Sequence, residues 1–318
     1  MKVLFTADIH YKLGQKHVPV EWAKNRYKMF QDQLVEICAQ ADLLIIGGDI
    51  WDKYPSAEEL ELYFSLVKAI PIKTFIYSGN HESTTKHGTF FTNFKDVTNW
   101  INPLVEVIDD YFSYESIDFI PYNKLKHFEK DGHKFTGTML CTHVRGEIPP
   151  HVKPEVDLSI FDKWEVVLAG DLHAYENSQR NILYPGSPLT TSFHRHTVDT
   201  GVVLFDFISM SHQHITLKLP QLIRKTIKAG EPMQPTEYHH TIYEIEGDMS
   251  ELGALADSDL IDKKIIKRDT DTTLILAPDL TLEEEVNEYL RYVLQLSDSA
   301  VEDALQELNN YANELIKN

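Results

Sequence analysis

The chain has 318 residues, of which 42% are hydrophobic and 25% are charged. These values are ordinary for a globular protein, and the length predicts a large core with a smaller appended part. The net charge of −19 argues against a protein that coats nucleic acid through bulk attraction, although most of the acidic excess falls after residue 220.

Three features predict a cytoplasmic protein. The apolar run at the start of the chain is too short for a signal peptide. No run approaches the roughly 20 apolar residues that span a membrane. The two cysteines, Cys38 and Cys141, lie in separate apolar settings, as expected for buried thiols in a reducing compartment.

The first hundred residues alternate between predicted strands and helices. Apolar runs predict strands over 3–6, 43–46 and 72–77. Helical spacing predicts a helix over 22–38, and a capping box at Ser56–Glu59 predicts the start of another. This alternation is typical of a parallel sheet covered by helices, and such sheets bind ligands outside the carboxyl ends of their strands.

Short β-like runs dominate after residue 100. They cover 119–121, 138–141, 166–169, 182–184, 201–207 and 214–217. Turn residues separate them, including a rigid turn over 184–188. We therefore expect a second, more antiparallel sheet packed on the first.

The last third of the chain has a different character. Weak strand signals at 241–245 and 272–276 predict a small α+β unit over 221–278. From residue 280 onward, a capping box at Thr281–Glu284 and two apolar stripes predict a pair of amphipathic helices. Their apolar faces must pack either on their own domain or on a partner, and the sequence leaves both possibilities open.

Polar side chains stand at the ends of several predicted strands. They are Asp8, His10, Asp49, Asn80, His81, His143, Asp171 and His173. Each alone is more often structural, but together these carboxylates, imidazoles and amide predict a shared site for Mn²⁺, Mg²⁺, Fe or Zn²⁺. Two such ions can clamp the attacking and leaving oxygens of phosphoryl transfer. Asp49 is central enough to lie between the ions, and His81 is expected to face the substrate.

Five ordered motifs resemble those of calcineurin-like metallophosphoesterases: Asp-x-His, Gly-Gly-Asp, Gly-Asn-His-Glu, a lone strand-end His and Gly-Asp-x-His. The opening at 1–10, the segment 79–83, the turn at 185–188 and the terminal helices resemble the SbcD-type nuclease subunit of double-strand-break repair, in its tailed-phage versions. The resemblance implies an α/β sandwich of two mixed β-sheets flanked by helices. It also implies a dimetal nuclease domain over 1–220, a small α+β capping domain over 221–278 and a helical partner-binding segment over 279–318.

The resemblance further implies a role for each motif residue. One metal ion would be held by Asp8, His10, Asp49 and His173, and the other by Asp49, Asn80, His143 and Asp171. His81 would be the catalytic acid, supported by Glu82. The resemblance assigns no role to Asp52, which we expect either to support the site or to start a helix. Two positions depart from the family pattern. The family usually has His where Asp171 stands, and Asp where Glu82 stands next to the catalytic His, which that carboxylate usually orients.

The implied activity is hydrolysis of DNA with two divalent ions, Mn²⁺ or Mg²⁺, as an exonuclease on duplex ends and an endonuclease on single strands. The implied partners are DNA, a second copy of the chain and an SbcC-type P-loop ATPase with a coiled coil, because this chain lacks Gly-x-x-x-x-Gly-Lys-Ser/Thr. The candidate DNA contacts are Lys12, Lys16, Arg26 and Arg195. A phage-encoded protein would act in the host cytoplasm. The alternatives are a dimetal phosphatase or small-nucleotide phosphodiesterase, and a scaffold that only binds DNA ends or the ATPase.

Overall fold

The computed structural model describes residues 1–83, 88–234, 238–247, 252, 258, 260–265, 280–294, 296–297 and 300–308. The chain divides into two compact units. One comprises Met1–Glu246 with Ala254–Lys263, and the other comprises Gly247–Gly253 with Lys264–Asn318. Within the described residues, no helix combines the length and apolar character needed to cross a membrane.

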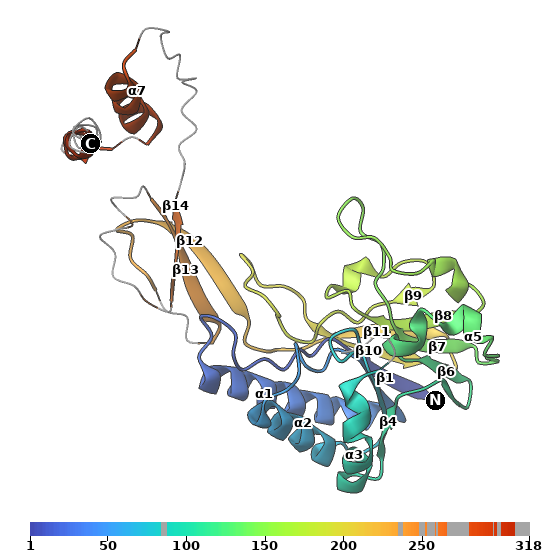
Figure 1. Cartoon of the computed structure of the whole chain (residues 1–318). Helices are drawn as coiled ribbons and strands as arrows, with labels where there is room; N and C mark the ends of the chain where they lie inside the picture. Colours follow the sequence, from blue (N-terminus) through green and yellow to red (C-terminus); the bar gives the residue numbers. More distant parts are fainter. Residues whose placement is uncertain are drawn as a thin grey trace. The chain divides into compact units, whose positions relative to one another are not determined.

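The larger unit contains a six-stranded sheet in the order β11-β10-β1-β2-β3-β4 (Figure 1). Its strands are Lys2–Thr6 (β1), Leu43–Gly47 (β2), Lys73–Tyr77 (β3), Val105–Ile108 (β4), Gly201–Asp206 (β10) and Ser211–Thr216 (β11). Strands β1 to β4 are parallel, and β10 and β11 extend the sheet in antiparallel fashion. The helices between the parallel strands are α1 (Val20–Ile37), α2 (Ala57–Ala69) and α3 (Lys95–Ile101). The predicted capping box of Ser56 and Glu59 starts α2.

A second sheet has five strands in the order β5-β6-β7-β8-β9. They are Phe112–Tyr114 (β5), Ile117–Ile120 (β6), Met139–His143 (β7), Val166–Gly170 (β8) and Ile182–Leu183 (β9). Strands β6 to β9 are parallel, and β5 is antiparallel to β6.

The expectation of a more antiparallel second sheet is therefore wrong. The runs at 201–207 and 214–217 form β10 and β11, which join the first sheet beside β1. The crossovers of the second sheet contain only short helical pieces, such as Tyr122–Leu125 (α4), Phe128–Asp131 (α5) and Leu158–Phe161 (η3). Helices this short leave no periodic pattern in the sequence, so the parallel connections could not be recognised.

Apolar side chains from both sheets fill the space between them. Phe5 and Phe75 of the first sheet meet Phe119 and Leu168 of the second, and all four are fully buried. The other face of the first sheet packs against α1 and α2, where Phe30 is also fully buried. The fold is thus the expected sandwich of two mixed sheets flanked by helices, and it holds the carboxyl ends of the parallel strands close together.

A three-stranded sheet in the order β12-β13-β14 follows in the chain. Its strands are Leu222–Lys228 (β12), His240–Gly247 (β13) and Ile261–Ile265 (β14). Strand β13 contains the predicted run at 241–245, whereas the run at 272–276 lies outside the described residues. The loop between β9 and β10 pairs with this sheet, because His194 N donates to Leu222 O at 3.0 Å and Arg224 N donates to His194 O at 2.8 Å.

The second unit contains helical segments near the chain end. Helix α7 (Leu282–Glu288) starts at the predicted capping box of Thr281 and Glu284 and continues as a π-helical turn over Tyr289–Val293 (η5). Residues 300–308 are helical, where the second amphipathic helix was expected, and residues 309–318 lie outside the description. The side chains of Leu282, Tyr289 and Leu294 are 65%, 49% and 46% exposed. Apolar groups of this segment therefore face solvent.

Candidate metal centre

The carboxyl ends of parallel strands from both sheets meet at one place. The polar residues there are Asp8 after β1, Asp49 after β2, Asn80 after β3, His143 at the end of β7 and Asp171 after β8. Backbone hydrogen bonds continue between the loops beyond β1 and β2, where Asp8 N donates to Gly48 O at 3.0 Å and His10 N donates to Asp49 O at 2.9 Å. The fold thus brings the predicted strand-end residues together.

Several of these residues have a strained backbone. The φ angles are 57° at Asp8, 49° at His10, 52° at Asp49 and 102° at Asp171. Residues other than glycine rarely adopt such angles, which cost about 1–3 kcal/mol each and gather at functional sites. Gly48 has a φ of 90°, and a Cβ there would lie 2.5 Å from Gly79 N, so this turn requires a glycine.

Asp49 lies at the centre of the cluster. Its Oδ2 is 3.7 Å from His10 Nε2, 3.5 Å from His143 Nε2 and 3.9 Å from His81 Nε2. Burial alone would raise the pKa of Asp49, but the imidazoles of His143, His10 and His81 lower it below its usual value. The ionised carboxylate therefore faces imidazoles from both sheets.

Asp8, His10 and His173 form one side of the centre, with one ligand atom from each lying within 4.8 Å of the others. His10 Nε2 is 3.2 Å from His173 Nε2, which is 4.0 Å from Asp8 Oδ1. Burial raises the pKa of Asp8 well above its usual value, helped by the charge of Asp49. Burial lowers the pKa of His10 to about 3, so its imidazole is neutral, as metal binding requires. A cation bound among these groups would favour the ionised form of Asp8.

Asn80 and His143 form the other side. His143 Nδ1 donates to Gly47 O at 2.8 Å, which directs Nε2 toward the side-chain amide of Asn80 at 2.9 Å. Burial alone would lower the pKa of His143, but the carboxylates of Asp49, Asp8 and Asp171 raise it well above its usual value. The carboxylates thus attract positive charge at this imidazole, which a divalent ion can supply in place of a proton, so the donor set fits a metal.

Glu82 ties two site loops together. Its buried carboxylate accepts hydrogen bonds from the backbone N–H groups of Asp49 at 3.0 Å, Gly79 at 2.7 Å and Trp51 at 3.1 Å. Burial and the nearby charge of Asp49 raise the pKa of Glu82 to about 7. Glu82 therefore supports the backbone of the loops after β2 and β3, whereas the family pattern suggested that it orients the ring of His81.

His81 approaches Asp49 from a more open side. Its Nδ1 lies 2.6 Å from the carbonyl oxygen of Asp52, so Nδ1–H donates there and Nε2 is directed at the site. Its side chain is 34% exposed, in contrast to the buried His143. The carboxylate of Asp52 instead pairs with Lys12 Nζ at 2.9 Å. Asp52 thus orients His81 through its backbone.

Asp171 is held differently from the other predicted ligands. Its backbone N–H donates to both carboxylate oxygens of Asp8 at 3.1 Å. Its own carboxylate forms a bidentate pair with Arg145, at 3.1 Å to Nε and 3.3 Å to Nη2, and its Oδ1 is 3.9 Å from His143 Nε2. Among the described residues, the His and carboxylate groups close enough to share one metal ion do not include Asp171. Sequence reasoning missed Arg145, whose pairing with Asp171 joins residues 26 positions apart in the chain.

The predicted DNA contacts lie in different environments. Lys16 is exposed, and Arg195 is 58% exposed and lies 3.5 Å from Glu244 of the small sheet. Arg26 is only 2% exposed, and its Nη1 donates to the carbonyl and hydroxyl oxygens of Thr190, each at 3.1 Å. The expected DNA contact of Arg26 is therefore wrong, because the guanidinium is buried and holds the loop that follows β9.

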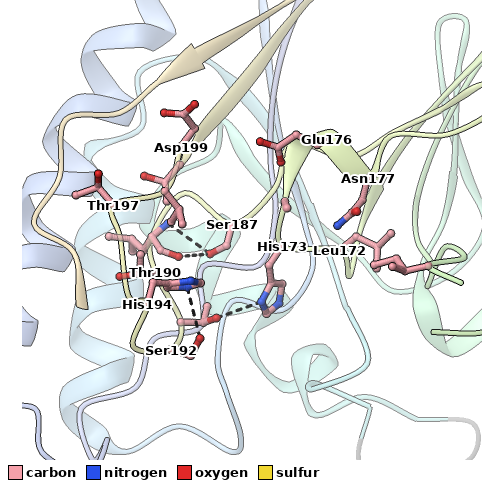
Figure 2. Close-up of a pocket in the computed structure, with 16 residues that line it drawn as sticks. Leu172, His173, Glu176, Asn177, Ser187, Thr190, Ser192, His194, Thr197 and Asp199 are labelled. Atoms are coloured by element: carbon pink, nitrogen blue, oxygen red, sulfur yellow. Dashed lines mark hydrogen bonds between the residues drawn. The ribbon is translucent and has the colours of Figure 1, made fainter. Parts of the chain in front are cut away.

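A cavity of about 510 Å³ opens beside His173 (Figure 2). In its wall, Thr191 Oγ1 lies 3.1 Å from His173 Nδ1 and orients that imidazole. Ser187, also in the wall, donates to the carbonyl oxygen of Asp8 at 2.7 Å. The lining combines hydroxyl, imidazole and carboxylate groups with apolar side chains, so a cavity large enough for a small organic group adjoins the centre at His173.

Comparisons with known proteins agree with this geometry. Residues 1–215 match the calcineurin-like phosphoesterase family. The chain is 42% identical over 323 residues to the "Probable exonuclease subunit 1" of Escherichia phage T5, covering 98% of both proteins. It is 23% identical over 228 residues to a protein of Invertebrate iridescent virus 6 described as a phosphoesterase, covering 65% of this chain and 76% of that protein.

A solved archaeal phosphodiesterase is 13% identical, with a TM-score of 0.40 and coverage of 68% of this chain and 100% of that one. The family match extends over both sheets and every strand end that contributes to the centre. The chain therefore belongs to the calcineurin-like phosphoesterases and is a metal-dependent hydrolase of phosphate esters.

Proposed function

We propose that this chain is the nuclease subunit of a DNA recombination and repair complex. It would hydrolyse phosphodiesters with Mn²⁺, as an exonuclease on duplex DNA and an endonuclease on single strands. The observation that carries the proposal is the position of Asp49, whose Oδ2 lies within 3.9 Å of imidazole nitrogens of His10, His81 and His143. The name of the phage T5 relative, which is similar over nearly the whole chain, supports DNA as the substrate.

The donor set supports two divalent ions. Carboxylates, imidazoles and an amide oxygen without thiolates suit Mn²⁺, Mg²⁺, Fe or Zn²⁺, and the family resemblance favours Mn²⁺. One ion would be held by Asp8, His10, Asp49 and His173, and the other by Asp49, Asn80 and His143. When bound, such ions activate a water molecule and offset the charge of the phosphate. Asp49 would serve both sides because its carboxylate faces both.

His81 would donate a proton to the leaving oxygen. Its Nδ1–H is committed to the Asp52 carbonyl, which fixes the ring and makes Nε2 the transferable position. Its partial exposure allows contact with substrate, whereas the buried His10 and His143 face the carboxylates. The same imidazolium would also stabilise the charge that develops on the phosphate.

The partner would be a P-loop ATPase with a coiled coil, and the active form would be a homodimer. The exposed apolar side chains of Leu282, Tyr289 and Leu294 support docking through the terminal helices. Deleting 280–318 should abolish co-purification with the ATPase while leaving Mn²⁺ binding, measured by calorimetry, unchanged. Retained co-purification would refute this docking site.

The function is tested with end-labelled linear duplex DNA, circular single-stranded DNA and bis(p-nitrophenyl) phosphate as a generic diester. With Mn²⁺, and with the ATPase supplied, we expect shortening of the duplex and cleavage of the circle. Turnover of the diester with both DNAs intact would instead favour a phosphatase or small-nucleotide phosphodiesterase. Sedimentation of the active protein would test the homodimer.

A further inference from the structure

The pair of Asp171 and Arg145 occupies a place where the family pattern has an imidazole. Both carboxylate oxygens of Asp171 are engaged, Oδ2 with Nε at 3.1 Å and Oδ1 with Nη2 at 3.3 Å. A bidentate pair of this kind fixes the guanidinium plane as well as its position. The carboxylate is thereby turned to Arg145, while His143 Nε2 lies 3.9 Å from Oδ1.

The surroundings hold this pair rigidly from both ends. The backbone N–H of Asp171 donates to Asp8, and the backbone N–H of Arg145 donates to Glu155 Oε1 at 3.2 Å. The Asp171 side chain is 7% exposed, but that of Arg145 is 43% exposed. The acid is therefore buried at the centre, and the cation lies on the solvent side of it.

The guanidinium retains donors for a further ligand. Arginine carries five N–H donors, and the bidentate pair uses one on Nε and one on Nη2, which leaves three. Arginine binds phosphate through the same fork geometry that binds carboxylate. The charge of the Arg145 guanidinium also matters. Without it, Asp8, Asp49 and Asp171 would place three carboxylates next to a polyanionic substrate. Arg145 offsets the charge of Asp171 and attracts the phosphate.

We propose that Arg145 binds the phosphate group next to the reacting one on the substrate strand, and that Asp171 positions Arg145 instead of holding a metal ion. Asp171 separates Arg145 from His143, so the guanidinium is one side chain removed from the metal centre. That separation suits a neighbouring phosphate better than the reacting one. The inference rests on the proposed function, because a polynucleotide strand presents a second phosphate one nucleotide away from the reacting one.

The test compares Arg145→Gln on two substrates. Cleavage of DNA should show a KM raised on the order of 10-fold, because a charge-assisted contact is lost. The KM for bis(p-nitrophenyl) phosphate, which has a single phosphate, should rise much less than the KM for DNA. The affinity of Arg145→Gln for DNA is measured with Ca²⁺ replacing Mn²⁺ to prevent cleavage. The negative slope of log affinity against log salt should become shallower by about 0.7–0.9, as expected for the loss of one phosphate contact.

Arg180→Gln is the matched control. Arg180 is 45% exposed and pairs with Asp162 at 2.6 Å on the surface, so it reproduces the loss of an exposed arginine–aspartate pair. Its DNA cleavage should equal that of the unaltered chain. Asp171→Asn should raise the KM for DNA as Arg145→Gln does and should bind as many Mn²⁺ ions, by calorimetry, as the unaltered chain.

Three results would overturn the proposal. Loss of a Mn²⁺ ion in Asp171→Asn would make Asp171 a metal ligand. An equal loss on both substrates in Arg145→Gln would mean that Arg145 only supports the metal centre. If Arg145→Gln cleaves DNA as well as Arg180→Gln does, Arg145 does not bind the substrate. If the unaltered chain leaves DNA intact but hydrolyses the diester, the proposed function fails and the Arg145 proposal fails with it.

Discussion

The two sides of the metal centre use the same kind of strand end but direct their side chains differently. On the His173 side, Asp8, His10 and His173 bring ligand atoms within 4.8 Å of one another. On the His143 side, the carboxylate of Asp171 is turned to Arg145. The strand end thus determines where the backbone of each residue lies. Neighbouring side chains determine which group its charged side chain contacts.

The largest effect should come from Asp49→Asn, because this carboxylate faces both sides. We expect diester hydrolysis to fall on the order of 10³-fold and Mn²⁺ binding to weaken on both sides. Calorimetry and turnover of bis(p-nitrophenyl) phosphate measure the two effects. Asp162→Asn, at an exposed surface carboxylate, is the control. Loss of only one Mn²⁺ ion would show that Asp49 binds on a single side and does not serve both ions.

His81→Gln should separate chemistry from metal binding. We expect kcat to fall roughly 10²-fold because the proton donor is lost. The number of Mn²⁺ ions bound should not change, since His81 is proposed to face the substrate. His81 Nε2 also clusters with His10 and Asp49, so a missing ion in the calorimetric titration would identify it as a ligand.

Thr191→Val addresses only the His173 side. Thr191 Oγ1 is the acceptor for His173 Nδ1, and loss of such a partner typically weakens metal affinity by about 10-fold or more. One of the two Mn²⁺ binding events should weaken, and the other should be unaffected. Thr197→Val, in the same cavity wall, is the control. Equal weakening of both events would show that the two sides are not independent.

Glu82→Gln should lower the stability of the fold more than it weakens metal binding on either side of the centre. The amide nitrogen of the new side chain would face a backbone N–H donor, which leaves hydrogen-bonding groups unpaired. We expect a loss of about 1 kcal/mol in the free energy of unfolding, measured by denaturant titration of the metal-free chain. Glu106→Gln, at a partly exposed ion pair with Lys73, should change it less. An unchanged stability would contradict the role given to Glu82.

The parts of the site that could be predicted are those whose positions depend on the local sequence. Apolar runs ending at Asp8, Asp49 and Asn80 identify parallel strands, and the carboxyl ends of such strands lie at one edge. The start of α2 follows from a similarly local signal, whereas the sandwich of two mixed sheets was expected from the family motifs. These features depend on residues within a few positions of one another.

The rest depends on contacts between distant parts of the chain. Arg26 looked like a surface cation, but it meets Thr190 after a separation of 164 residues. Strands β10 and β11 were expected in the second sheet, yet β10 pairs with the free edge of β1. The direction of the Asp171 carboxylate likewise depends on Arg145, 26 residues away. No local pattern carries this information.

The most direct test is anomalous diffraction from crystals grown with Mn²⁺. Two manganese peaks should lie on either side of the Asp49 carboxylate, one contacting His10 and His173 and the other contacting Asn80 and His143, with Asp171 still paired to Arg145. A single peak that does not contact Asp49, or no peak among these residues, would contradict the dimetal centre.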